Sequence, residues 1–181
     1  MSEIQVASRY AKSLIDLAQE QNVLEKVRED IASFVATLKE NSQLRAVLAN
    51  PIITPDKKFA ILSQLFGENS HPMILGFFKI VTNKGRSEIL FSTAKEFLSE
   101  YDQLKGIVNA TVTSAAPLSE ENIIKIVNAV QDATRGKVHL TTKVNPELIG
   151  GFVLKVGDKQ FDTSISSSLN KLKKEFAQKF Y

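Results

Sequence analysis

The sequence predicts an all-α six-helix bundle over residues 1–104, followed by a small α+β domain over residues 105–181. Two observations support this division. Up to Leu104 the apolar residues recur at the three- and four-residue spacing of amphipathic helices. From residue 107 to residue 113 the chain is β-branched, and its period changes to two. With 181 residues, of which 43% are hydrophobic and 24% charged, the chain is long enough for two small domains.

Apolar periodicity and end signals define the helices of the first half. They are predicted over residues 4–20, 23–38, 44–48, 55–66, 72–81 and 90–104. The third ends before Pro51, because a residue that precedes proline is pushed out of helical geometry. Thr54 offers an N-cap hydroxyl and Pro55 suits the first helical position, so the fourth helix begins here, and Gly67 ends it. A turn at residues 83–86 precedes the sixth.

The second half alternates strands, helices and turns. Strands are predicted over residues 107–113, 138–144, 152–156 and 159–161, and helices over residues 120–135 and 165–180. Ser119 is expected to cap the first of these helices, and Gly136 to end it. The last two strands form a hairpin with its turn at residues 157–158. Gly150 and Gly151 are expected to allow a bulge or a close backbone approach where the chain enters this hairpin.

No residue set in the sequence points to catalysis, to a cofactor or to a metal. The chain has no cysteine, and its two histidines, His71 and His139, lack a second histidine at metal-binding spacing. The glycines do not have the spacing of nucleotide-binding loops. Asp158 and Asp162 flank the hairpin, where turn and cap roles account for both. We therefore expect no catalytic, cofactor-binding or metal-binding residues.

The charge of the chain argues against nucleic acid as its partner. The chain has 23 basic and 20 acidic residues, a net charge of +3, and residues 105–181 hold 11 of the basic and 7 of the acidic ones. This is far from the concentrated positive charge that drives binding to phosphate backbones. The β-α-β order resembles a KH-type RNA module, but it lacks the G-x-x-G clamp. A basic nucleic-acid adaptor is therefore the second hypothesis, and a stand-alone enzyme the third.

The first and fifth helices have more apolar surface than one core requires. The apolar arc of the first covers about half of its circumference, and residues 73–81 of the fifth are apolar nearly all round. Side by side, the two helices would form a groove for an amphipathic helix of a partner, with a shallow floor of alanines. The alternative is that the fifth helix is the central buried helix of the bundle. Residues 73–81 are in any case too short to span a membrane.

Three segments of the chain form its most specific pattern. They are Ala-Ser-Arg-Tyr-Ala-Lys at residues 7–12, Asn-Lys-Gly-Arg at residues 83–86, and Val-Asn-Pro-Glu-Leu-Ile-Gly-Gly-Phe-Val-Leu-Lys-Val-Gly-Asp at residues 144–158, which Asp162 and Ser164 follow. Together they resemble the δ subunit of bacterial F-type ATP synthases, the relative of the mitochondrial oligomycin-sensitivity-conferral protein. The resemblance extends along essentially the whole chain.

The resemblance implies a noncatalytic stator subunit of a proton- or ion-translocating F-type ATP synthase. Such a subunit links the catalytic head to the peripheral stalk, so that rotor torque drives ATP synthesis at the cytoplasmic face of the bacterial cell membrane. It implies that residues 1–104 bind the N-terminal helices of the α subunits and that residues 105–181 bind the peripheral-stalk b subunits. The α-subunit contact would use Ala7, Tyr10, Ala11, Leu14, Phe77 and Ile80.

Two further expectations follow from the resemblance. Replacing Leu14 or Phe77 by aspartate should weaken binding of the α-subunit peptide while the bundle stays folded. Many relatives carry arginine or lysine just after the Asp-x-Ser element, where this chain has three serines at residues 166–168. That departure argues against a charge-assisted stalk contact at this point.

Overall fold

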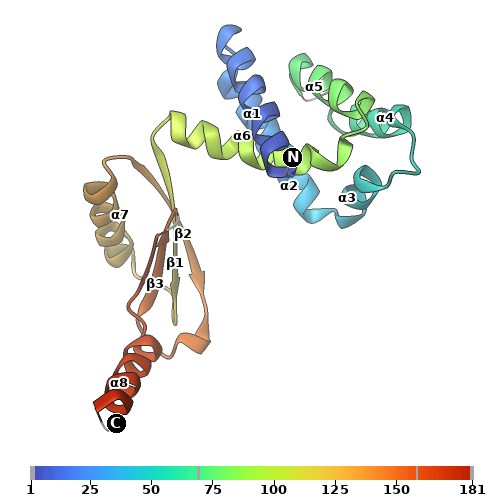
Figure 1. Ribbon diagram of the computed structural model, residues 1–181. Helices are drawn as coiled ribbons and strands as arrows, with labels where there is room; N and C mark the ends of the chain where they lie inside the picture. Colours follow the sequence, from blue (N-terminus) through green and yellow to red (C-terminus); the bar gives the residue numbers. More distant parts are fainter. Residues whose placement is uncertain (1–2, 69, 158, 180–181) are drawn as a thin grey trace. The chain divides into compact units, whose positions relative to one another are not determined.

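The computed structural model describes residues 3–68, 70–157 and 159–179 (Figure 1). The chain divides into two compact units, Met1–Tyr101 and Asp102–Tyr181, which are described separately below. The first unit is helical and the second combines helices with a sheet, so the predicted order of fold classes along the chain is confirmed. The division falls inside the last helix of the first half, slightly before residue 104.

Helices follow one another through the first unit, joined by short turns. They are α1 (Glu3–Glu20), α2 (Leu24–Glu40), α3 (Ser42–Ala49), α4 (Pro55–Phe66), α5 (Pro72–Asn83), the 3-10 turn η1 (Ser87–Ile89) and α6 (Leu90–Leu104). Two of the predicted caps occupy the expected positions without the expected chemistry. Thr54 precedes α4, but its side chain makes no capping hydrogen bond. Gly67 follows α4 at φ −62°, a right-handed conformation, so it does not provide the left-handed C-cap.

The core of the first unit fixes which side of α5 faces inward. Phe78 of α5 packs against Phe34 of α2 and Phe66 of α4, with ring centroids 4.7 and 6.2 Å away. Ile74, one turn before Phe78, is also buried. Because residues four apart share a helix face, this inward face leaves Gly76 and Ile80 exposed, while Met73 and Phe77 are half-buried against the rim of the core.

A buried lysine joins three elements of the first unit. Lys58 Nζ donates hydrogen bonds to the Leu48 carbonyl, 2.8 Å away, and to Ser87 Oγ, also 2.8 Å away. Ser87 Oγ in turn donates to the same Leu48 carbonyl at 2.7 Å. This carbonyl belongs to the last turn of α3, where helical carbonyls lack partners and where a positive charge is favourable.

The second unit is a four-stranded sheet with helices. Its elements are β1 (Ile107–Ser114), α7 (Glu120–Thr134), β2 (Lys137–Val144), the 3-10 turn η2 (Pro146–Leu148), β3 (Phe152–Val156), β4 (Lys159–Asp162) and α8 (Ile165–Lys179). The strand order is β2-β1-β3-β4, with β1 and β2 parallel and the other pairs antiparallel. Helix α7 is the crossover between the parallel strands. The predicted hairpin is present: Gly157 takes φ +55° in its turn, and Asp158 lies outside the described residues.

Candidate functional site

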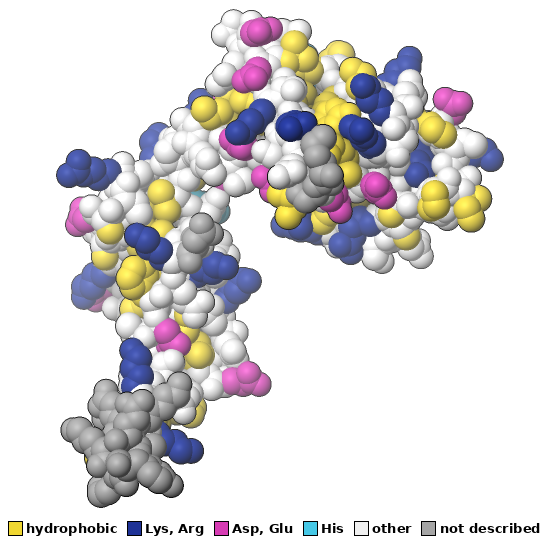
Figure 2. All heavy atoms as spheres, in the orientation of Figure 1, with side chains coloured by type: hydrophobic (Ala, Val, Ile, Leu, Met, Phe, Trp, Pro, Cys, Tyr) yellow, Lys and Arg dark blue, Asp and Glu magenta, His cyan; other side chains and the backbone are white. Residues whose placement is uncertain are grey.

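A groove of about 590 Å³ lies between α1 and α5. In Figure 2 hydrophobic side chains gather between these two helices. The residues that line the groove are Tyr10, Ser13, Leu14, Leu17, Gln21, His71, Pro72, Met73, Gly76, Phe77 and Ile80. On each helix they recur every three or four positions, which is the spacing of a single helix face. The two outward faces therefore meet along one apolar channel.

The exposure of the lining shows that the chain itself does not fill this channel. Ile80 is 55% exposed, and Tyr10 and Phe77 are half-buried. Leu14, in contrast, is only 3% exposed and forms the base of the groove. The rings of Tyr10 and Phe77 meet edge to face, with centroids 6.2 Å apart, so they join α1 to α5. Full burial of α5 as a central helix is therefore not what the structure shows.

Two of the predicted contact residues lie elsewhere. Ala7 and Ala11 are fully buried and do not line the groove, so the structure removes them from the surface that a partner could contact. They lie on the buried side of α1 with Leu14, Ile15 and Ala18, whereas Tyr10 and Leu17 lie at one edge of the apolar arc and line the groove. Periodicity gives the width of such an arc but not which part of it is covered.

Gly76 opens the middle of the groove and was not anticipated from the sequence. It lies inside α5, and a Cβ atom at this position would meet nothing within 4 Å. Glycine inside a helix costs about 1 kcal/mol relative to alanine, so helix stability does not account for its presence. The missing side chain leaves space for another backbone to approach α5 closely.

Polar residues of the groove have structural roles of their own. His71 caps α5, because its Nδ1 accepts a hydrogen bond from the backbone N–H of Met73 at 3.3 Å. The backbone N–H of His71 donates to Asp30 Oδ2 at 2.7 Å. His139, the second histidine of the chain, is exposed on β2. Within the described ranges no three histidine, aspartate or glutamate residues are arranged to hold a metal ion.

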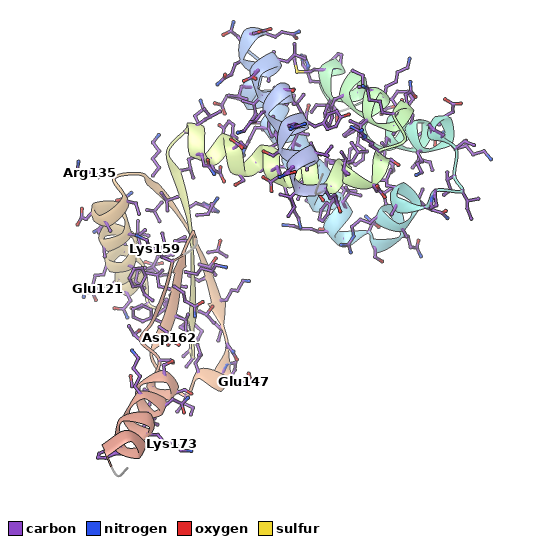
Figure 3. The ribbon with its side chains drawn as sticks, in the orientation of Figure 1. Glu121, Arg135, Glu147, Lys159, Asp162 and Lys173 are labelled. Atoms are coloured by element: carbon purple, nitrogen blue, oxygen red, sulfur yellow. The ribbon has the colours of Figure 1, made fainter. Side chains whose placement is uncertain are left out.

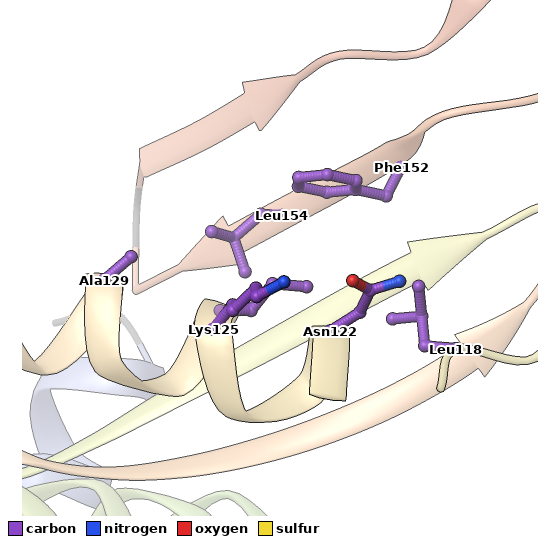
Figure 4. Close-up of a pocket in the computed structure, with 7 residues that line it drawn as sticks. Leu118, Asn122, Lys125, Ala129, Phe152 and Leu154 are labelled. Atoms are coloured by element: carbon purple, nitrogen blue, oxygen red, sulfur yellow. The ribbon is translucent and has the colours of Figure 1, made fainter. Parts of the chain in front are cut away.

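A second, smaller groove of about 370 Å³ lies in the C-terminal unit between α7 and β3 (Figure 4). It is lined by Leu118, Asn122, Lys125, Ile126, Ala129, Phe152 and Leu154. Helix α7 packs against β2, so it leaves Phe152 and Leu154 of β3 only partly covered. Phe161 of β4 pairs with Leu154 and is 54% exposed, which extends the apolar strip toward the sheet edge.

The third segment of the δ-like pattern, residues 144–158 with Asp162 and Ser164, contacts the start of α8. Asp162 accepts hydrogen bonds from the backbone N–H of Ser164 at 2.9 Å and from Ser167 Oγ at 2.6 Å. The Ser164 side chain is buried and caps α8 by accepting from the backbone N–H of Ser167 at 3.2 Å. Gly151 takes φ +77°, and a Cβ there would lie 2.4 Å from the Thr163 carbonyl oxygen. The predicted close backbone approach is therefore present, and it lies against the α8 cap.

The charged residues that Figure 3 labels on the rest of the C-terminal unit are dispersed. Figure 3 labels Glu121, Arg135, Glu147, Lys159 and Lys173, which belong to different elements and do not converge on one point. The side chains of these residues therefore do not form a polar site comparable to the two apolar grooves. None of the helices that the structure describes is both long enough and apolar enough to cross a bilayer.

The cap at Asp162 predicts a pH dependence. Hydrogen bonds from Ser167 and then from Ser164 hold the pKa of Asp162 below its usual value of 3.8. A lowered pKa means that the carboxylate contributes its stabilisation above pH 3.8, and that this is lost as the pH falls through the lower value in the folded state. We expect a carbon-13 NMR titration of the Asp162 carboxyl to have its midpoint below 3.8. A midpoint at or above that value would contradict the cap.

Both grooves are apolar and lie beside packed helices, and the described residues that line them bring no polar groups together. Such grooves are typical of adaptors that bind helices of other proteins. They differ from catalytic pockets, in which nucleophiles, acids and bases converge. The fold and the two grooves therefore indicate the class of helix-binding adaptors.

Comparison with known proteins gives the family. Residues 6–176 match the family model described as ATP synthase delta (OSCP) subunit. The chain is 40% identical over 178 residues to ATP synthase subunit delta of Cytophaga hutchinsonii, covering 98% of this chain and 97% of that relative. It is 38% identical over 171 residues to the subunit delta of Nostoc punctiforme, covering 93% and 92%. The chain therefore belongs to the ATP synthase delta (OSCP) subunit family, and the predicted resemblance is confirmed.

A solved structure supports the fold. A chain in the cryo-EM structure of the Toxoplasma gondii mitochondrial ATP synthase hexamer is similar, with a TM-score of 0.75 and 22% identity, covering 94% of this chain and 97% of that one. Family membership also confirms the predicted function: the chain is a noncatalytic stator component of the peripheral stalk of an F-type ATP synthase.

Proposed function

We propose that the groove between α1 and α5 holds the N-terminal helices of the α subunits of the catalytic head, and that the C-terminal unit holds the peripheral-stalk b subunits. The observation that carries this proposal is the open apolar groove in the helical unit of a delta-family chain. In this function helices α1–α6 act as one six-helix bundle. The chain links head to stalk at the cytoplasmic face of a bacterial cell membrane, and it is peripheral to that membrane.

The chemistry of the groove suits a permanent mechanical link. A stator must resist rotor torque for many catalytic cycles, which calls for slow dissociation of its contacts. Burying apolar side chains such as Ile80 and Phe77 against a partner helix lowers the dissociation rate. An apolar contact also depends little on salt, whereas a contact dominated by phosphate charges depends on it strongly.

The C-terminal unit also has an exposed apolar surface, which suits the proposed stalk contact. The α7–β3 groove and the exposed Phe161 form an apolar strip that a helix of a b subunit can cover. The first turn of α8 carries three serines, and Ser167 is engaged by Asp162. We therefore assign this stalk contact to apolar burial and not to charge at the start of α8.

The proposal is tested by calorimetric titration of the full chain. The titrants are a 25-residue peptide from the start of the α subunit of the same organism, its scrambled version, and a C-terminal fragment of the b subunit. We expect the α peptide and the b fragment to bind simultaneously, with affinities that change less than about threefold between 50 and 200 mM salt. Failure of the α peptide to bind, or binding that collapses with salt as for a nucleic-acid adaptor, would contradict the proposal.

A further inference from the structure

We propose that the α1–α5 groove has a cationic end, formed around Arg86, that binds a carboxylate of the incoming helix and thereby fixes the direction in which that helix lies. The inference rests on the proposed function and deepens it. It commits to one occupant, an amphipathic helix whose apolar stripe ends in an acidic side chain. The reasons are the continuity of two hollows and the distribution of charge around them.

The groove continues at one end into a smaller hollow of about 220 Å³. That hollow is lined by Val6, Arg9, Tyr10, Ser13 and Arg86. Tyr10 and Ser13 also line the main groove, so the two hollows form one channel. An occupant that follows the apolar lining of α1 past Tyr10 therefore meets two arginines.

Tyr10 connects the apolar part of this channel to the cationic part. Its ring lies edge-on to Phe77, and its hydroxyl accepts a hydrogen bond from Arg86 Nη1 at 3.2 Å. The backbone N–H of Arg86 donates to the Val81 carbonyl at 3.0 Å, which ties the residue to the end of α5. The guanidinium is thus positioned by two elements of the groove.

Arg86 retains donor capacity for a ligand. A guanidinium has five N–H donors in a planar fork that matches a carboxylate, and the side chain is exposed. Arg9 adds positive charge, but it also lines a neighbouring shallow hollow that contains Glu96 and Lys12. Arg86 is therefore the principal group of the cationic end, and Tyr10 is its positioning residue.

The opposite end of the groove has a different character. There the lining consists of Gln21, His71 and Pro72, and none of the described residues that line the main groove is lysine, arginine, aspartate or glutamate. Among the described lining residues, an acidic side chain on a docked helix meets arginine only at the Arg86 end, where it gains an ion pair as well as a hydrogen bond. Complementary charge at one end selects one orientation and penalises the reverse one.

A double-mutant cycle on the full chain tests the inference. The probe is the α-subunit N-terminal peptide, unchanged or with each acidic residue replaced in turn by its amide. Arg86→Gln is expected to weaken binding of the unchanged peptide about 10-fold. One of the amide replacements in the peptide should weaken its binding to the wild-type chain by a similar factor. The same replacement should hardly change the binding of the peptide to Arg86→Gln. The position of that replacement in the peptide gives the direction of the helix.

Lys79→Gln is the matched control. It removes one positive charge from α5, seven residues before Arg86, but Lys79 lies beside Phe59, with its Nζ 5.9 Å from the ring centroid, and does not line the groove. The affinity of Lys79→Gln for the peptide should equal that of the wild-type chain. As a second measurement, the wild-type chain is titrated with the unchanged peptide and with its amide variant at 50 and at 500 mM salt. The difference in affinity between the two peptides should be smaller at the higher salt concentration. This measurement does not depend on how Arg86→Gln folds.

The outcomes separate the two proposals. Normal binding without coupling at any acidic position would overturn the cationic end and leave the groove assignment intact. A peptide that does not bind the wild-type chain would overturn the proposed function, and the direction of the helix with it.

Discussion

Ile80→Asp is expected to weaken binding of the α-subunit N-terminal peptide about 100-fold while the chain stays folded. Ile80 lines the groove and is 55% exposed, so the free chain tolerates a charge there. Docking of a helix would remove the isoleucine from water, which is worth roughly 1.5–3 kcal/mol. It would also desolvate the new carboxylate, and the two effects together correspond to about 3 kcal/mol. Calorimetric titration measures the affinity, and thermal unfolding monitors the fold.

Leu65→Asp is the control for this substitution. Leu65 is 53% exposed on α4, nearly the same fraction as Ile80, but it does not line the groove. Its variant should bind the peptide with unchanged affinity. Equal losses in the two variants, or no loss in either, would show that the groove is not the docking surface. Leu14→Asp cannot serve here: Leu14 is 3% exposed, so a charge there is expected to unfold the bundle, contrary to the expectation from the sequence.

Gly151→Ala is expected to destabilise the C-terminal unit by at least about 2 kcal/mol more than Gly157→Ala does. Both glycines have positive φ, +77° and +55°, so both variants bear the cost of a left-handed residue, about 1–2 kcal/mol. At Gly157 a Cβ meets nothing within 4 Å. At Gly151 it would lie 2.4 Å from the Thr163 carbonyl oxygen and 2.9 Å from Ser164 Cα, and both neighbours are backbone.

Denaturant unfolding of the full chain, followed by hydrogen exchange of β3 and α8, separates the two glycine variants. The protection of α8 should fall in Gly151→Ala and persist in Gly157→Ala. The b-subunit fragment should lose affinity only for the first variant. Equal unfolding free energies of the two variants would mean that the backbone around Gly151 and the α8 cap moves aside at no cost. That result would refute the role of Gly151 in holding the start of α8.

The periodicity of the sequence was sufficient to predict the order of elements and part of the groove. Tyr10, Leu14, Phe77 and Ile80 line the groove, because helical spacing determines which residues share a face, and their contact with a partner stays a prediction. Ala7 and Ala11 are buried and do not line the groove, because spacing cannot tell which part of a broad apolar arc the rest of the fold covers. The surroundings of α1 include α2, which follows it directly, but also η1 and α6, which are distant in sequence.

Tertiary contacts determined the features that the sequence did not reveal. Lys58 is buried because carbonyl and hydroxyl groups of α3 and η1 surround its ammonium group, and no local pattern indicates this. The α7–β3 groove combines Leu118 with Phe152, which are brought together only when the sheet forms. Thr54 has the residue type of a cap, but type alone does not orient its hydroxyl toward the helix.

The glycine in the middle of α5 has a consequence for the lifetime of the chain outside its complex. Gly76 makes an isolated α5 less stable than alanine would, and it leaves space in which the backbone of another helix can approach α5. Occupancy by a helix would then stabilise the folded chain by an amount that rises with the logarithm of the ligand concentration, since ligands that bind only the native state shift the unfolding equilibrium. We therefore expect the unassembled subunit to be cleaved by proteases faster than the assembled one, which would couple its abundance to the supply of its proposed partners.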